Sequence, residues 1–143
     1  MRLTRGADYG ARGMVYLASR PPDSVVLVSR IAAAEQLPVN YLAKIFQDLA
    51  KGGIVRSHRG AKGGFSLARP ASQITLRQVM EAVEGPVALL RCLAPSEGCD
   101  RMGTCPIYPV LASAQDQLVA LLDATTLQDL VESSGVRQAA TVP

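Results

Sequence analysis

Residues 39–65 read VNYLAKIFQDLAKGGIVRSHRGAKGGF, and this stretch decides the fold. Its first half carries apolar residues at helical spacing, which predicts one buried face: Leu42, Ile45, Phe46 and Leu49. Gly52-Gly53 predicts the end of that helix. Two short runs at 54–58 and 65–68 then predict strands, and the loop between them, residues 59–64, is rich in glycine and basic residues. The stretch therefore predicts a helix followed by a β-hairpin with a long positive tip.

The flanking sequence adds further helices. Residues 3–19 have an apolar side, and Pro21-Pro22 predicts a turn after them. Ser29 is the expected N-cap of a short helix that runs to Gln36, and Pro38 suits the first turn of the helix that follows. Downstream, Thr75 and Gln78 have the spacing of a capping box, and Gly85-Pro86 predicts the end of that helix.

Two short helices joined by a tight turn and followed by a basic hairpin are the layout of a winged helix-turn-helix. The expected fold is mainly α with a small β-hairpin wing. The expected organisation is a winged helix-turn-helix domain at 1–85 with its wing at 54–68, a cysteine loop at 86–106, a dimerisation helix region at 107–132 and a flexible tail at 133–143.

Composition excludes several classes of protein. The chain has 143 residues, 48% of them hydrophobic, which is enough for one packed domain. No apolar run approaches the ~20 residues that span a bilayer, and no export signal is recognisable, so we expect a cytoplasmic protein. Metalloprotease, hydrolase and nucleotide-binding signatures are missing from the sequence, so we do not expect an enzyme.

Charge is distributed unevenly. Residues 1–70 hold eleven Lys and Arg against four Asp and Glu, a net charge of +7, whereas residues 71–143 hold four against eight, a net charge of −4. A basic half next to an acidic half indicates that the first half contacts a polyanion. A chance fluctuation of surface charge is the alternative explanation.

Candidate DNA contacts lie on the helix at 39–51 and on the hairpin. The helix face opposite the apolar stripe carries donors, a cation and an aromatic ring, although a solvated helix face has a similar composition: Asn40, Tyr41, Lys44 and Gln47. Ser29, at the start of the preceding helix, joins this set. The glycine-flanked hairpin tip makes a narrow arm, on which Arg59 and Gly60 suit the minor groove. Arg56, His58 and Lys62 are expected to contact phosphates.

Three cysteines, Cys92, Cys99 and Cys105, lie in one loop. The close Cys pair of most zinc sites is missing, so zinc is disfavoured but stays open. Three thiolates in one loop can hold an iron–sulfur cluster, whose fourth ligand must then come from elsewhere. Three unrelated thiols are the remaining alternative.

The helix at 107–124 has a larger apolar face than its own domain obviously uses, and this face predicts pairing with a second copy. The alternative is that the helix packs back on its own domain. A symmetric homodimer would place two recognition helices on successive turns of a palindromic DNA site.

Together these motifs resemble the IscR/NsrR-type iron–sulfur transcription regulators. The resemblance covers almost the whole chain and rests on Met1-Arg2-Leu3-Thr4, on the segment from Leu49 to Val55, on Arg59-Gly60-Ala61-Lys62-Gly63-Gly64-Phe65, on the cysteine triad and on Thr126 to Val131. It implies a homodimer with a long crossing helix, and a cluster held by Cys92, Cys99 and Cys105.

The fourth ligand depends on the subtype. In IscR-like members a histidine three residues after the last cysteine completes the set, but this chain has Tyr108 there. In NsrR-like members an acidic residue near the N-terminus of the partner subunit serves, and Asp8 stands at the matching position. The first cysteine spacing has six intervening residues rather than five, so the subtype and the choice between [2Fe–2S] and [4Fe–4S] stay open.

The resulting hypothesis is a DNA-binding transcriptional regulator, most simply a repressor, whose cluster senses nitric oxide, redox state or iron–sulfur status. The alternatives are an iron–sulfur electron-transfer module and a zinc-stabilised DNA-binding protein without a sensing role.

Overall fold

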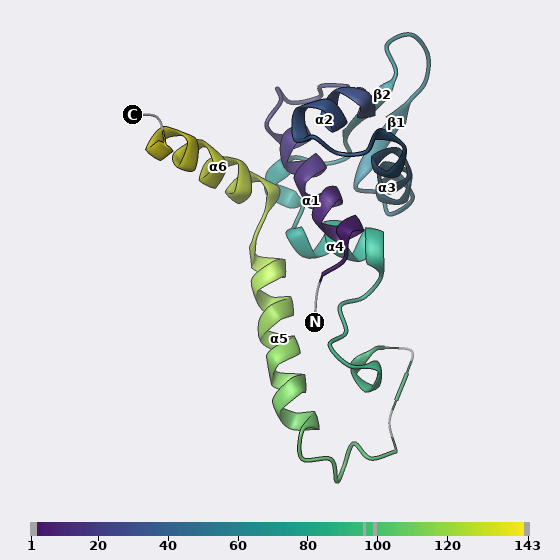
Figure 1. The fold of residues 1–143 in the computed structure, drawn as a ribbon, viewed down its shortest axis with the longest axis vertical. Coiled ribbons are helices and arrows are strands. Elements are labelled where there is room, and N and C mark those ends of the chain that lie inside the picture. The colour runs from purple at the N-terminus through teal and green to yellow at the C-terminus, as the bar shows by residue number, and fades with distance from the viewer. Residues whose placement is uncertain (1–2, 96, 99, 142–143) are drawn as a thin grey trace.

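The computed structural model describes residues 3–95, 97–98 and 100–141 (Figure 1). The fold is mainly helical. Within the described residues, its one sheet is a pair of antiparallel strands, as expected for a winged helix-turn-helix. The elements, in chain order, are α1 (Arg5–Ala18), α2 (Val28–Glu35), α3 (Val39–Lys51), β1 (Val55–His58), β2 (Gly64–Leu67), a 3-10 turn (Ala71–Gln73), α4 (Leu76–Glu84), a second 3-10 turn (Arg91–Leu93), α5 (Tyr108–Ala124) and α6 (Leu127–Thr141).

Helix α1 runs through the middle of the domain and contacts α2, α3, α4 and α6 (Figure 1). The four apolar residues predicted to form the buried face of α3 are all in the core. Larger side chains that are almost fully buried join helices from both ends of the chain: Met14, Ile31, Phe46, Ile74, Val79 and Leu127. The C-terminal region therefore completes the core of the DNA-binding domain.

Two capping boxes lie side by side where α4 and α6 begin. Thr75 accepts a hydrogen bond from the backbone N–H of Gln78 at 3.1 Å, as the sequence predicts, and the side chain of Gln78 accepts from the N–H of Thr75. Thr126 and Asp129 repeat this arrangement at the start of α6. An isolated antiparallel bridge pairs Thr75 with Thr126, so the end of α5 is fixed to the start of α4.

Two local expectations are wrong. Ser29 does not cap α2: the helix begins one residue earlier, at Val28, and the extended Leu27 precedes it without a side-chain cap. Ser29 therefore lies exposed in the first turn. The second is the end of regular structure at Ser133: α6 runs from Leu127 to Thr141, so residues 133–141 continue this helix.

Helix α5 extends away from the domain, and only its C-terminal part packs against it (Figure 1). Leu122 is buried with Ala7 and Met80 in a small second cluster, which Leu118 also contacts. The cysteine loop connects α4 to the far end of α5. None of the helices in the described part of the chain is long and apolar enough to cross a membrane.

Candidate nucleic-acid interface and cysteine loop

The second and third helices meet in a tight turn. Gln36 adopts the left-handed conformation at φ 56°, and its successor Leu37 donates its N–H to the carbonyl of Ala32, which closes α2. Pro38 then precedes the first residue of α3 instead of lying within its first turn. This turn sets α3 across α2, so that the face opposite the buried stripe points to solvent.

That exposed face of α3 carries the predicted contact residues. Asn40, Lys44 and Gln47 are all exposed. Tyr41 is also 42% exposed, but its ring packs edge-on against Tyr9 of α1, with 5.7 Å between the ring centroids. Tyr41 therefore has a structural contact that the sequence did not reveal, and this contact fixes α3 against α1.

The hairpin pairs Val55 with Leu67 and His58 with Gly64 in antiparallel register. Its tip closes in a turn in which the N–H of Gly63 donates to the carbonyl of Gly60 at 2.9 Å. Gly60 has φ +100°, a conformation that favours glycine. Arg59, Gly60 and Lys62 are all exposed at this tip.

The base of the wing is tied to the segment that enters α2. Val26 and Phe65 exchange two backbone hydrogen bonds of 2.9 Å each. A Cβ on Gly64 would lie 2.4 Å from the carbonyl oxygen of Val26, so a side chain at this position would disrupt the bridge. The wing is therefore held from both sides, by its own pairing and by residue 26.

Arg56 and His58 alternate along β1 and share one face of the hairpin, both of them exposed. The Nε2 atom of His58 lies 2.8 Å from the hydroxyl of Ser66, which is buried. The sequence suggested no partner for this histidine, and the cross-strand serine supplies one. One ring nitrogen is therefore engaged within the hairpin.

Sequence reasoning missed Arg30. This side chain is exposed in the first turn of α2, next to Ser29. The first helix of a helix-turn-helix crosses the DNA backbone, where a cation contributes to binding. The excess of positive charge in the first half of the chain was the available signal.

The cysteine loop brings Cys92 close to α5. Cys92 lies in the turn Arg91–Leu93, and Cys105 lies three residues before α5 begins; both are half-buried free thiols. Gln115 of α5 holds the Cys92 turn from both sides: it accepts from the N–H of Leu89 at 2.9 Å and donates to the carbonyl of Leu93 at 3.3 Å. Cys99 lies outside the described residues.

The donor chemistry of this loop fits an iron–sulfur cluster. Thiolates are the preferred ligands of such clusters, and the triad supplies three of them. Cys105 lies three residues before the first residue of α5, a helix of 17 residues. The residues present are therefore compatible with an anionic metal–sulfur group.

Asp8 lies in the first turn of α1 and is exposed. Its carboxylate lies 3.9 Å from the guanidinium of Arg12, which also donates to the backbone carbonyl of Glu35 at 2.7 Å. In the described part of a single chain, no three His, Cys, Asp or Glu residues form a group that could hold a metal. Asp8 therefore does not join Cys92 and Cys105 within one chain.

The helix-turn-helix, the basic glycine wing and the exposed recognition face define a winged-helix DNA-binding protein. The family model of the Rrf2 proteins, described as "Iron-dependent Transcriptional regulator", matches residues 3–133. The chain belongs to the Rrf2 family.

Two relatives from Mycobacterium tuberculosis bear the names of HTH-type transcriptional regulators, MT1325 of strain CDC 1551 / Oshkosh and Rv1287 of strain ATCC 25618 / H37Rv. Each is 33% identical over 130 residues, which cover 91% of this chain and 81% of the relative. Both relatives are named as transcriptional regulators, which agrees with the expectation of a regulator rather than an enzyme.

Solved structures give the same fold. CymR (YrzC), the global cysteine regulator of B. subtilis, has a TM-score of 0.76 at 27% identity, with 93% of this chain and 98% of that chain covered. IscR of T. potens has a TM-score of 0.77 at 24% identity, with 100% of this chain and 93% of that chain covered, and this likeness concerns the fold alone. The expected resemblance to IscR-type regulators is confirmed at the level of family and fold.

Proposed function

We propose that this regulator is a homodimeric repressor whose affinity for a palindromic operator depends on an iron–sulfur cluster. The observation that carries the proposal is the pair of hydrogen bonds from Gln115, since they attach the turn that holds Cys92 to the middle of α5. A change at the cysteine loop thereby acts on α5, the helix that we assign to dimerisation.

On DNA, α3 enters the major groove and the wing tip enters the adjacent minor groove. Asn40, Lys44 and Gln47 reach base edges, and Arg59 occupies the minor groove, where negative potential attracts it. Phosphate contacts come from Arg56, Lys62 and the free ring nitrogen of His58, together with Ser29 and Arg30 in the first turn of α2. Tyr41 and Gly60 contribute mainly by shaping these surfaces.

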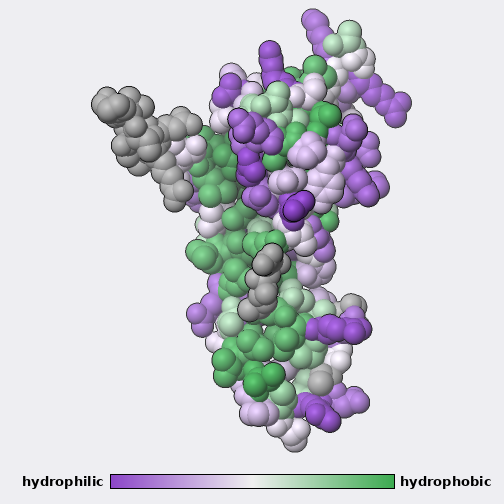
Figure 2. Space-filling model, in the orientation of Figure 1, coloured by the Kyte–Doolittle hydropathy of each residue, from purple (hydrophilic) through white to green (hydrophobic). Residues whose placement is uncertain are grey.

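Pairing through α5 is supported by its exposed apolar face. Ile107, Val110 and Leu121 are 57%, 67% and 65% exposed. Figure 2 shows hydrophobic residues gathered over the lower part of the molecule, to which α5 extends. A second copy of the same helix covers such a face symmetrically and spaces two recognition helices along the DNA.

Cys92, Cys99 and Cys105 are the proposed cluster ligands of one subunit. Asp8 of the second subunit is the proposed fourth ligand, because the position of Tyr108 lacks histidine. When bound, the cluster supplies a group that nitric oxide, oxidants or iron supply can alter. The chain contributes the three thiolates and the Gln115 contacts, and the exposed carboxylate of Asp8, which lies 3.9 Å from Arg12, would come from the second subunit.

A zinc-stabilised regulator without a sensing role is the second candidate. Family membership favours regulation over electron transfer, so the metal is the point to test. Iron, acid-labile sulfide and zinc are measured per chain on protein purified without oxygen. Two or four iron atoms with matching sulfide support the cluster and give its type, whereas one zinc without sulfide contradicts it. A chain that contains neither iron nor zinc also contradicts the proposed cluster, but it does not contradict the proposed DNA binding.

A further inference from the structure

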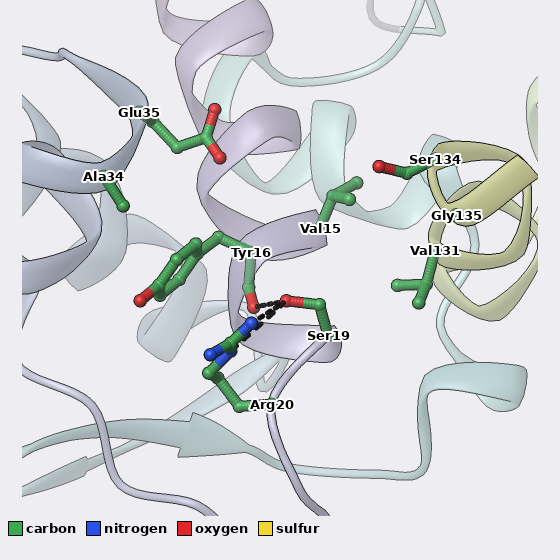
Figure 3. Close-up of a pocket in the computed structure, with 9 residues that line it drawn as sticks. All are labelled: Val15, Tyr16, Ser19, Arg20, Ala34, Glu35, Val131, Ser134 and Gly135. Carbon is green, nitrogen blue, oxygen red and sulfur yellow. Dashed lines mark hydrogen bonds between the residues drawn. The ribbon is translucent and has the colours of Figure 1, made fainter. Parts of the chain in front are cut away.

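A pocket of about 390 Å³ lies where the C-terminal ends of α1 and α2 meet α6 (Figure 3). Val15, Ala34 and Val131 give it apolar walls, and Arg20, Glu35 and Ser134 give it polar groups. Its volume lies in the range of about 300–1,000 Å³ that small-molecule sites occupy. None of these residues belongs to the proposed DNA contacts or to the cysteine loop.

Arg20 is exposed and provides one positive pole. Its guanidinium stacks on the ring of Tyr16, with 4.9 Å between Cζ and the ring centroid. Its Nε and one terminal nitrogen also lie 3.4 and 3.3 Å from the hydroxyl of Ser19. A guanidinium has five N–H donors in a planar fork, so these contacts leave donors for a carboxylate.

Glu35 provides a negative pole on a different helix. In Figure 3 its carboxylate extends from the end of α2 toward the space in front of α1. Arg12 contacts one carboxylate oxygen, with 3.7 Å between its Nε and Oε2, and also binds the backbone carbonyl of Glu35. The carboxylate is thus held in place by a residue that does not line the pocket.

Gly135 lines the α6 side of the pocket. A Cβ built at this position meets no atom within 4 Å, so the glycine faces empty space. A larger side chain here would occupy that space without a backbone clash.

We propose that this pocket binds a small zwitterionic α-amino acid with a short apolar side chain. Its carboxylate pairs with Arg20, its ammonium group pairs with Glu35, and its side chain contacts the valine walls. One occupant then touches both the first helix of the helix-turn-helix and α6. The proposal goes beyond the cluster-dependent function and does not rest on it.

Calorimetric titration of the 143-residue protein, without DNA, tests this site. The probes are L-valine and two analogues that each lack one charge, isobutylamine and isovalerate. We expect saturable binding of valine at one molecule per chain, with a Kd below about 1 mM, and at least about tenfold weaker binding of each analogue. Wild-type protein that does not saturate, or that binds an analogue as tightly as valine, overturns the proposal.

Matched variants locate the site. Arg20→Gln and Gly135→Leu should each weaken valine binding by about tenfold or more. Arg5→Gln, at the opposite end of α1, and Ser133→Leu, on the exposed side of α6, should leave it unchanged. Circular dichroism confirms that each variant folds. If Arg20→Gln fails to fold, Gly135→Leu decides, because it fills the pocket and favours helix. Wild-type affinity in the folded pocket variants contradicts the assignment.

Discussion

The aromatic rings of Phe65, on the second strand of the wing, and Phe46, on the buried face of α3, pack together with 5.2 Å between their centroids. Phe65 also pairs through its backbone with Val26, at the entrance to α2. One residue therefore joins the wing to both helices of the helix-turn-helix. DNA reading by α3 and by the wing tip should depend on this connection, because it sets the distance between the two contacts.

Gly64→Ala should loosen the wing. The added Cβ would lie 2.4 Å from the carbonyl oxygen of Val26, and φ at this residue is +139°. We expect a loss of about 1–3 kcal/mol in the free energy of unfolding, measured by urea denaturation, and weaker operator binding. Gly103→Ala is the control, because a Cβ there meets nothing within 4 Å. Equal stability of the two variants would show that the bridge between Val26 and Phe65 does not hold the wing in place.

Arg59 and Lys62 both lie at the wing tip, but replacing each with alanine should weaken DNA binding in a different way. Arg59→Ala should cost about 1–3 kcal/mol of operator binding and relax specificity at the minor-groove step. Lys62→Ala should weaken specific and non-specific DNA equally and lower the salt slope by about 1. Fluorescence anisotropy against operator and scrambled duplexes, over a salt series, separates the two. Unchanged operator affinity in Arg59→Ala would remove the minor-groove assignment.

Each cysteine of the triad should be needed for the cluster but not for the fold. Cys92→Ser, Cys99→Ser and Cys105→Ser should lose the visible absorbance and the iron of protein prepared without oxygen, because an alcohol is a poor ligand for a metal–sulfur group. Sedimentation should still show a folded dimer. Thr104→Ser, next to Cys105, should keep its colour, and a fully coloured Cys99→Ser protein would refute the ligand role of that residue.

The Gln115 contacts predict a local protection from exchange. Gln115→Ala removes the acceptor for the N–H of Leu89 and the donor to the carbonyl of Leu93. Each such bond contributes about 1 kcal/mol, so hydrogen exchange at Leu89 should become about fivefold faster. Gln117→Ala is the control, since Gln117 bonds only with Ser113 of its own helix among the contacts described. Identical exchange in both variants would show that Gln115 does not stabilise the Cys92 turn.

The sequence could predict what local pattern determines. The period of Leu42, Ile45, Phe46 and Leu49 marks one buried face, and Thr75 with Gln78 marks a helix start; the structure contains both. The hairpin followed from glycines and from the change of period. In each case the pattern lies within one short segment of the chain, and even the hairpin pairs residues no farther apart than Val55 and Leu67.

Long-range pairs were not predictable in this way. Gln115 and Leu89 are 26 positions apart, and the bridge between Val26 and Phe65 joins segments that are still farther apart in the sequence. The amphipathic pattern shows that a residue is exposed or buried but not which distant backbone group it meets. The pocket at Arg20 and Glu35 was missed for the same reason, since three helices from both ends of the chain build it. Ser29 was wrongly predicted to be the N-cap of α2. The helix begins after the extended residue Leu27, and a nearby serine does not by itself determine where a helix begins.

The exposed face of α5 gives the last prediction. Val110→Asp places a charge on a side chain that is 67% exposed in the single chain. An aspartate on the monomer surface has little effect on stability, but an aspartate buried between two helices leaves an unpaired charge without water. Sedimentation should therefore show Val110→Asp as a monomer whose circular dichroism matches the wild type, and operator binding should fall to that of one half-site. Ser133→Asp, exposed on α6, should remain a dimer. If Val110→Asp remains a dimer, the subunit interface does not include this face of α5. The proposed link between the cysteine loop and the spacing of the two recognition helices is then contradicted as well.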